Sequence, residues 1–318
     1  MVSIPASQHR QKTHRMNKKH RITERTIAPY YFVAPFLVFY IVFLVFPIIF
    51  NVYVSFTDWN AFGKANFIGI DNYIELLSDS RFFMSLGNTG ILMLMITPIQ
   101  MVLGMLIAVV LSQKYFPFPN AFRLANFLPY LTTPVALGIF FAMLFDTHFG
   151  YVNKMLELIG ITGPDWFGKV WPARFLTAIL TVWRWSGYTA VMFMAGITNI
   201  SDTIYEAADI DGTNAWQRFW YITLPLLKDV AVFVIIANMI GFFQLFEEPV
   251  MLFTGSGMGS HSIGGPRNAV LTGLWMMYDT SFGTVMRYGY GSAISVGLFV
   301  IIGVVTIVFK KIVGKEGY

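Results

Sequence analysis

The sequence predicts an all-α membrane protein with six transmembrane helices. Of its 318 residues, 56% are hydrophobic and 12% are charged, whereas soluble domains carry about 25% charged residues. The mean hydropathy is +0.60. A spanning helix needs about 20 residues, mostly apolar, and the chain has six apolar segments of that size. They run approximately over residues 29–50, 86–112, 123–145, 174–197, 227–247 and 288–309.

The first apolar segment follows a basic region, as a signal peptide does. Its uncharged run extends from Thr26 to Thr57, which is too long for a signal peptide, and it lacks a small-residue cleavage site. We therefore expect a retained helix. Prolines lie inside or near the ends of the first three segments, so we expect kinked helices around a cavity. These prolines are Pro35, Pro47, Pro98, Pro129 and Pro134.

Lysines and arginines predict the orientation, because cytoplasmic loops are enriched in them. With the amino terminus inside, the cytoplasmic parts hold fourteen of the 22 and the outer parts seven, while Arg184 lies within a span. Both termini are then cytoplasmic. The chain is divided into a basic tail over residues 1–28, a six-helix transmembrane domain over 29–312 and a short cytoplasmic end over 313–318. A basic tail beside a spanning helix is typical of an orientation signal and of contact with anionic lipid, so no nucleic-acid partner is predicted.

The sequence lacks the motifs of several classes of enzyme. Without cysteine it has no disulfide or thiolate site, and its five histidines lie at no metal-ligand spacing. There is no P-loop, and neither His-Glu-x-x-His nor Gly-x-Ser-x-Gly occurs. The glycine-rich stretch over residues 255–265 is interpreted as a flexible outer loop. We therefore predict a chain that is not an enzyme, binds no metal or cofactor, and obtains energy from another subunit.

Residues 201–225 form a polar insert that predicts two short helices. Thr203 and Glu206 have the spacing of a capping box at the start of the first helix. Gly212 can adopt the left-handed conformation that ends this helix, after which Thr213 or Asn214 can cap the second. An aromatic stripe follows on the second helix before Pro225 closes the unit, which an ordinary amphipathic loop would also show. The stripe consists of Trp216, Phe219 and Trp220.

This insert resembles the EAA loop of binding-protein-dependent ABC importer permeases. The matching residues are Glu206, Ala207, Ala208, Gly212, Phe219, Ile222, Leu224 and Pro225. The resemblance extends over residues 28–310, through segments such as Tyr53–Trp59, Phe67–Tyr73 and Phe243–Phe246, to the carbohydrate-uptake type that includes maltose and glycerol-phosphate permeases. It implies the six-helix MetI-like fold with a cytoplasmic coupling-helix loop.

The resemblance also implies a set of partners in a bacterial inner membrane. These are a second, similar permease, two ABC ATPase subunits that hold ATP and Mg, and an extracytoplasmic solute-binding protein that delivers the carbohydrate. In the family, the short helix of the EAA loop sits in a cleft of the ATPase subunit. The residues expected to dock there are Glu206, Ala207, Ala208, Asp211, Gly212, Phe219 and Pro225. Glu206 can make a charge contact across that interface, serve as the capping-box partner, or do both.

Arg184 is the one charged residue deep in a predicted span, and such a residue is by default functional or paired. It can contact substrate, pair with Glu247 or Glu248, or extend toward the membrane surface. Nearby aromatic rings suit the faces of sugars, although an interfacial aromatic belt explains them nearly as well. The resemblance places the sugar path along the fourth and fifth helices. The candidates are Thr181, Arg184, Trp185, Tyr188, Asn238, Phe242, Phe243, Gln244, Phe246 and Glu247.

The predicted function is that of a permease subunit in an ATP-driven ABC importer for an oligosaccharide. Arg184 and Arg287 make an acidic sugar of alginate type a sub-hypothesis, and a glycerol-phosphate ester would fit the same charges. The main alternative is a secondary transporter that acts without an ATPase. It requires titratable coupling groups in the spans, and few are present. A structural or scaffold protein is a third possibility.

Overall fold

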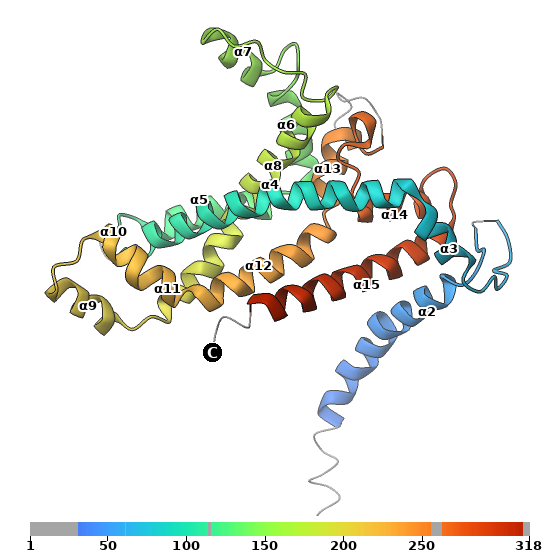
Figure 1. Cartoon of the computed structure of the whole chain (residues 1–318), viewed down its shortest axis with the longest axis horizontal. Coiled ribbons are helices and arrows are strands. Elements are labelled where there is room, and N and C mark those ends of the chain that lie inside the picture. Colours follow the sequence, from blue (N-terminus) through green and yellow to red (C-terminus); the bar gives the residue numbers. More distant parts are fainter. Residues whose placement is uncertain (1–30, 61, 114–115, 256–262, 314–318) are drawn as a thin grey trace, which may run out of the picture. The chain divides into compact units, whose positions relative to one another are not determined.

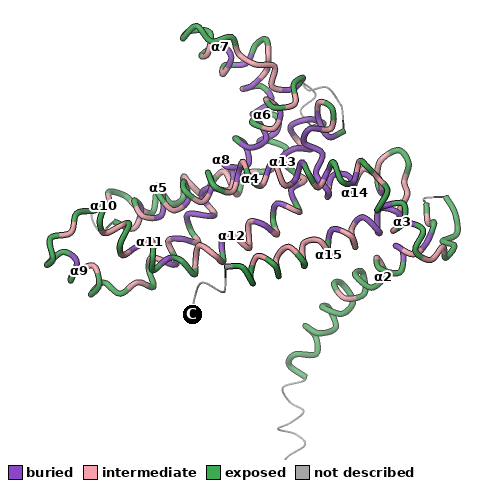
Figure 2. The backbone as a smooth tube through the Cα atoms, viewed as in Figure 1, coloured by how far each residue is buried: buried purple, intermediate pink, exposed green. Residues whose placement is uncertain are grey.

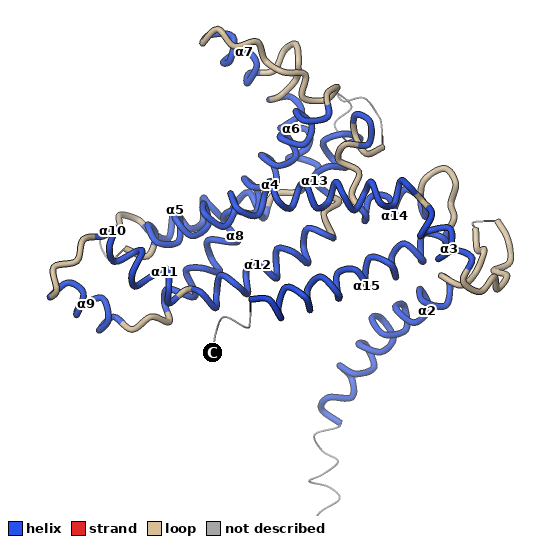
Figure 3. The backbone as a smooth tube through the Cα atoms, viewed as in Figure 1, coloured by secondary structure: helices blue, strands red, loops and turns tan. Residues whose placement is uncertain are grey.

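The computed structural model describes residues 31–60, 62–113, 116–255 and 263–313. The basic tail over residues 1–28, the residues after 313, and residues 256–262 of the glycine-rich stretch with His261 lie outside the described residues. Within the described ranges the chain is helical (Figure 3), and extended pairing is limited to an isolated bridge between Thr57 and Phe67. The all-α class is confirmed. The chain divides into two units, Met1–Tyr53 and Val54–Tyr318, which are described separately.

The first unit contributes most of one apolar helix, Tyr31–Val54. It includes a π-helical turn, η1 (Ile41–Val45), followed by α2 (Phe46–Val54). At 24 residues it is about 36 Å long, enough for the hydrocarbon core of a bilayer. Nearly all of its side chains are exposed (Figure 2). An apolar helix of this length without a packed face is suited to lipid or to another subunit.

The second unit contains the remaining helices. In chain order they are α3 (Asp71–Ser78), α4 (Ser80–Leu111), α5 (Pro119–Leu131), α6 (Pro134–Leu144), α7 (Tyr151–Leu158), α8 (Val170–Thr198), α9 (Asp202–Ile210), α10 (Ala215–Arg218), η2 (Phe219–Thr223), α11 (Leu224–Leu226), α12 (Lys228–Phe243), α13 (Glu247–Val250), η3 (Met251–Gly255), η4 (Pro266–Asn268), α14 (Gly273–Phe282) and α15 (Tyr288–Val313). The long helix α4 packs against α8, α12 and α14, and α15 packs against α12 and α14 (Figure 1). Helix α5 lies against α8.

Three described helices are long and apolar enough to cross a membrane alone: Tyr31–Val54, Ser80–Leu111 and Tyr288–Ile312. They correspond to the first, second and sixth predicted spans. The fourth predicted span lies inside α8, whose 29 residues are long enough but less apolar. The count of six spans therefore remains a prediction, with membrane-length helices at the first, second, fourth and sixth of the expected places.

The third predicted span is broken by a sharp bend, in agreement with the kink expected from its prolines, and a second bend lies at the beginning of the fifth predicted span. Helices α5 and α6 meet at a bend of 93°, and α10–α11 meets α12 at a bend of 65°. The first bend falls just before Pro134, which begins α6, because the residue before a proline is driven out of the helical conformation. Leu227, fully buried, lies at the second bend. Hydropathy merges α5 and α6 because apolar residues continue through their bend, whereas the fifth predicted span already begins at residue 227, where the second bend lies.

The main core lies where α4, α6, α8, α14 and α15 meet. Its members include Phe82, Phe141, Leu176, Leu271, Met276 and Ile294. A second cluster of Ala108, Phe193, Leu227 and Val234 joins α4, α8 and α12 near the polar insert. Gly187 allows close packing of α8 on α5, because a Cβ at this position would overlap the carbonyl of Asn126. These contacts fix α8 as the element around which the candidate sites are arranged.

Candidate functional site

The polar insert forms α9 and α10, joined by a tight turn at Gly212. Gly212 has φ of +72°, and its N–H donates to the Asp209 carbonyl while the Thr213 N–H donates to the Ala208 carbonyl. This pair of bonds is the Schellman arrangement that satisfies the end of a helix. Asn214 then caps α10 in a complete capping box with Gln217. The predicted roles of Gly212 and Asn214 are confirmed.

The predicted capping box at Thr203 and Glu206 is wrong. Helix α9 begins at Asp202, and its N-cap is Ser201, which makes no side-chain capping bond. The Ser201 and Thr203 hydroxyls instead lie 2.8 Å apart. Thr203 is therefore inside the first turn, where its hydroxyl cannot reach the amide that a capping residue would bind. The Glu206 side chain is left exposed rather than held as a capping partner.

Three contacts tie α9 to the turn and the helices that follow it. The Tyr205 hydroxyl lies 3.2 Å from the Thr223 hydroxyl, and Arg218 pairs with Asp209. The Thr213 hydroxyl donates to the Ala208 carbonyl at 2.8 Å. With helix caps on both sides of Gly212, these contacts make α9 and α10 one braced unit rather than a flexible loop.

The predicted docking residues fall on two sides of this unit. Glu206 and Ala207 are exposed, whereas Ala208 is 5% exposed and packs inward. Asp211 follows the last turn of α9, Phe219 begins η2, and the exposed Pro225 lies in α11. The exposed side of α9 thus has small and acidic residues together with Ile210 (87% exposed), and Trp216 (69% exposed) adds a large apolar surface on α10.

The second site surrounds Arg184 on α8. Its Nη1 lies 2.9 Å from Glu248 Oε1 and 3.1 Å from Glu247 Oε2. Trp185 Nε1 donates to the same Glu248 oxygen at 2.7 Å. Side-chain exposure is 9% for Arg184, 5% for Glu248 and 57% for Glu247. Arg184 is therefore paired, as one of the sequence alternatives held, and the group of three charges has one negative charge in excess.

Both carboxylates follow a break between α12 and α13. The predicted fifth span ran unbroken to residue 247, but α12 ends at Phe243 and Glu247 begins α13. Thr272 Oγ1 donates to the Leu245 carbonyl within this break at 2.6 Å, which satisfies a backbone group that the interrupted helix leaves unpaired. The break turns two consecutive glutamates toward Arg184.

Aromatic rings surround the Arg184 site on the α5 side. Tyr130, which the sequence analysis missed, lies 5.1 Å from Tyr188 in a stacked pair and 5.1 Å from Trp185 edge-on, measured between ring centroids. The third predicted span carries Tyr130 directly after Pro129. The sequence signal for Tyr130 was an aromatic residue beside a proline within a predicted span. Only the contact between α5 and α8 shows that Tyr130 lies near Arg184.

The other predicted path residues have different surroundings. Thr181 is buried and donates to the Thr177 carbonyl on its own helix at 2.7 Å. Phe242 is buried in the packing of α4 and α8. Asn238 and Phe243 are half-buried and Gln244 is exposed. Phe246 is half-buried and lies 4.9 Å from Tyr278, between ring centroids. Gln244, Phe246 and Glu247 therefore offer the accessible surface at the break.

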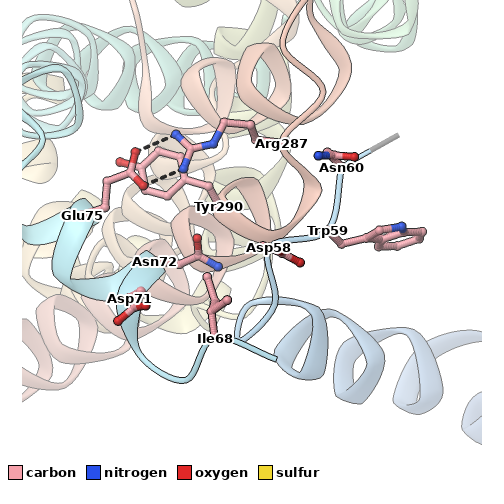
Figure 4. A pocket seen from close by; sticks show the side chains of 9 residues that line it. All are labelled: Asp58, Trp59, Asn60, Ile68, Asp71, Asn72, Glu75, Arg287 and Tyr290. Atoms are coloured by element: carbon pink, nitrogen blue, oxygen red, sulfur yellow. Dashed lines mark hydrogen bonds and ion pairs between the residues drawn. The ribbon is translucent and has the colours of Figure 1, made fainter. Parts of the chain in front are cut away.

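A separate pocket of about 180 Å³ lies between α3 and the beginning of α15 (Figure 4). Arg287 forms a bidentate pair with Glu75, with both nitrogen–oxygen distances at 2.6 Å, and this hydrogen bonding raises the pKa of the Arg287 guanidinium. Hydrogen bonds from Asn66 lower the pKa of the exposed Asp58. The lining residues are Asp58, Trp59, Asn60, Ile68, Asp71, Asn72, Glu75, Arg287 and Tyr290.

Comparison with known proteins assigns the chain to a family. The family model described as "Binding-protein-dependent transport system inner membrane component" matches residues 18–315. The chain belongs to this family. It is a multi-pass inner-membrane permease component of an importer, not an enzyme.

The permease is also similar to curated proteins over most of its length. It is 34% identical to the arabinooligosaccharides transport system permease protein AraP of Halalkalibacterium halodurans, covering 92% of this chain and 90% of that protein. It is 32% identical to the lactose transport system permease protein LacF of Rhizobium radiobacter, covering 86% of this chain and 90% of that protein.

A solved structure confirms the fold class. The permease matches a chain of a bacterial ABC transporter involved in the import of the acidic polysaccharide alginate, with a TM-score of 0.77 and 18% identity over 94% of this chain and 99% of that one. The predicted fold, an all-helical permease of the ABC importer type, is therefore confirmed.

Proposed function

We propose that this permease imports a carbohydrate, an oligosaccharide delivered by a solute-binding protein. The observation that carries the proposal is full-length similarity to permeases named for arabinooligosaccharides, for lactose and for starch degradation products. An alginate importer with the same fold has been solved with an oligosaccharide-bound periplasmic protein, which supports delivery in this manner.

The charges of the chain favour a neutral saccharide over an acidic one. The acidic sub-hypothesis rested on Arg184 and Arg287. Arg184 is paired with two carboxylates and Arg287 with Glu75, so neither is a free cation. At the Arg184 site the surplus charge is the carboxylate of Glu247, more than half exposed, and it repels a uronate or a phosphate ester. Carboxylates accept hydrogen bonds from neutral hydroxyl groups, and amides both accept from them and donate to them.

The α9–α10 unit is the proposed docking site for an ATPase subunit. The support is mechanical: caps, the Arg218–Asp209 pair and the Tyr205–Thr223 contact brace it, and a braced unit transmits rigid-body motion. Its accessible surface includes Glu206, Ala207, Asp211, Gly212 and Pro225, with Phe219 half-buried and Ala208 packed inward. ATP and Mg are then bound by two ATPase subunits, and a second permease completes the importer. Both termini face the cytoplasm with this unit.

The experiment has two parts. The tagged permease is purified in mild detergent, and the proteins that co-purify are identified by mass spectrometry; ATPase and permease partners are expected. The complex is reconstituted in proteoliposomes with its binding protein, and ATP-dependent uptake of arabino-oligosaccharides, malto-oligosaccharides and lactose is measured. A lone chain that transports without ATP would refute the importer and indicate a secondary transporter.

Substitution at the docking surface tests the coupling role. Glu206→Lys reverses an exposed charge on α9 and should reduce ATPase co-purification and uptake. Glu157→Lys, an equally exposed reversal on α7, is the matched control and should leave both unchanged. Normal uptake in the Glu206 variant would exclude a charge contact at this position.

A further inference from the structure

Five aromatic side chains form a continuous row in the second unit. Successive ring centroids are 4.9 Å apart for Phe246–Tyr278, 5.3 Å for Tyr278–Phe282, 5.9 Å for Phe282–Tyr288 and 5.2 Å for Tyr288–Trp59. The rings come from the turn before α13, from α14, from the first residue of α15 and from the segment before α3. Residues far apart in the sequence thus make one aromatic track, defined as these five side chains.

The aromatic track is accessible along its length. Tyr278 and Phe282, in the middle, are 46% and 58% exposed, and the other three rings are half-buried. Phe246 packs on the main core at one end, so this end of the track is held by the folded core. Neither the Tyr278 nor the Tyr288 hydroxyl is hydrogen-bonded to another residue in the described part of the chain, which leaves both phenols available to a ligand.

The track joins the two polar sites already described. At one end, Phe246 directly precedes Glu247, which pairs with Arg184. At the other end, Trp59 lines the pocket formed with Asp58, Asn60 and Glu75 (Figure 4). An aromatic surface facing only lipid has no reason to begin and end at carboxylates, because charged groups beside lipid are costly. Exposed apolar surface bordered by polar groups is typical of a ligand-binding groove.

We propose that the aromatic track guides a neutral oligosaccharide between the pocket at Trp59 and the Arg184 site. This inference rests on the proposed function and specifies the path. Aromatic rings suit the apolar faces of sugar rings, and neighbouring rings in the track are inclined to one another by 43° to 69°. Because stacking is weakly directional, a saccharide chain can shift from one ring to the next. The phenol hydroxyls donate to or accept from its hydroxyl groups, and the carboxylates at the two ends of the track accept hydrogen bonds from them.

The test compares variants that remove rings but keep apolar volume. Tyr278→Leu and Phe282→Leu are made in the complete importer and assayed in proteoliposomes with arabino-oligosaccharides and malto-oligosaccharides of graded length. The matched control is Phe299→Leu, a 77% exposed ring on α15 outside the track. Tyr278→Phe retains the ring and removes only the hydroxyl.

We expect each track variant to lower kcat/KM for the longer saccharides about three- to tenfold, the loss for one stacked contact. The loss should be smaller for the shortest probe, which spans fewer rings, and Tyr278→Phe should fall between wild type and Tyr278→Leu. Phe299→Leu should transport normally, and the amount of assembled importer should not change in any variant.

Three results would overturn the proposal. The first is unchanged uptake of every probe by both Leu variants. The second is an equal loss in Phe299→Leu, which would indicate a general effect of removing exposed rings. The third is loss of the second permease on purification of the track variants, which would make the track a subunit interface. Failure of the wild-type importer to transport any of the saccharides would instead contradict the proposed function itself.

Discussion

Removing the Arg184 side chain should destabilise the permease more than any other single change at this site. In Arg184→Met, the Glu248 carboxylate would keep its buried position, with 5% of the side chain exposed, and lose its cation at 2.9 Å. Breaking a buried ion pair on one side costs about 3–5 kcal/mol. Trp185 Nε1 would remain as the hydrogen-bond donor to that carboxylate. The expected loss in the free energy of unfolding is therefore about 3 kcal/mol.

Two matched variants separate the buried partner from the exposed one. Glu247→Gln removes a carboxylate that is 57% exposed and 3.1 Å from Arg184, so solvent screening limits its cost to about 0–1 kcal/mol. The double variant Arg184→Met/Glu248→Gln removes the isolated buried charge and retains an acceptor for Trp185. It should recover most of the stability lost in Arg184→Met.

The assay is thermal unfolding of the purified permease in detergent, followed by tryptophan fluorescence and by retention of the monodisperse peak. The Arg184→Met variant should unfold several degrees below wild type, and Glu247→Gln within a few degrees of it. Equal destabilisation by Arg184→Met and Glu247→Gln would refute the assignment of Glu248 as the buried partner. A double variant no more stable than Arg184→Met would show that packing, not charge, sets the cost.

Three further predictions concern the polar insert and the segment before α3 that contains Asp58. Gly212→Ala forces a side chain into a φ of +72° and should cost about 1–2 kcal/mol, seen as faster amide hydrogen exchange in α9. Asn214→Ala removes the capping box and should cost about 1 kcal/mol, seen as faster exchange at Gln217. The pKa of Asp58 is lowered from its ordinary 3.8 by hydrogen bonds from Asn66. The hydrogen bonds between Asp58 and Asn66 therefore stabilise the segment that contains them above pH 3.8, and this stabilisation is lost as the pH falls through the lowered pKa of Asp58. Limited proteolysis across acidic pH should show the loss for wild type and not for Asp58→Ala.

Local chemistry in the sequence was enough to place the turn between α9 and α10. Gly212 and Asn214 act through their own backbone and the next few residues, so spacing alone identifies them. Thr203 was placed wrongly for an equally local reason. Ser201 has the extended backbone of an N-cap, with φ of −63° and ψ of 132°, and helix α9 therefore begins two residues earlier than the Thr203 capping box requires.

Hydropathy located the membrane helices, and the prolines indicated kinks, but the sequence did not give the size of the bends. The apolar run of residues 123–145 continues through Thr132 and Thr133, two small polar residues that do not interrupt a hydropathy window. The bend of 93° depends on Pro134 and on the packing of α6 against η3. The bend at Leu227 follows Pro225, which was expected to close the polar insert, but nothing in the sequence indicates its angle or the burial of Leu227 against Phe193.

Contacts between residues that are far apart in the sequence could not be predicted from it, for a different reason. Asn88 donates to the carbonyls of Asn268 and Leu271 and accepts from Arg174, across 86 to 183 residues of sequence. Nothing in the spacing of these residues predicts the contacts, because the fold alone brings α4, α8 and the segment before α14 together. The aromatic track is of the same kind, since its five rings come from four separate segments.

Helix α12 is held to α8 near its beginning and just beyond its end, and this arrangement relates the two candidate sites. Near the polar insert, Phe193 of α8 packs with Leu227 and Val234 at the beginning of α12. Beyond the other end of α12, Arg184 of α8 holds Glu248 of α13. A displacement of the α9–α10 unit applied at Leu227 would therefore move α8 and α12 together, because a packed core does not absorb small shifts gradually. The double variant Arg184→Met/Glu248→Gln removes the ion pair and would release the α13 end of α12 from α8, while leaving the proposed docking surface on α9 and α10 intact. ATP hydrolysis should therefore continue with less sugar imported per ATP. Unchanged stoichiometry in that variant would mean that motion reaches the sugar path through α4 or α15 instead.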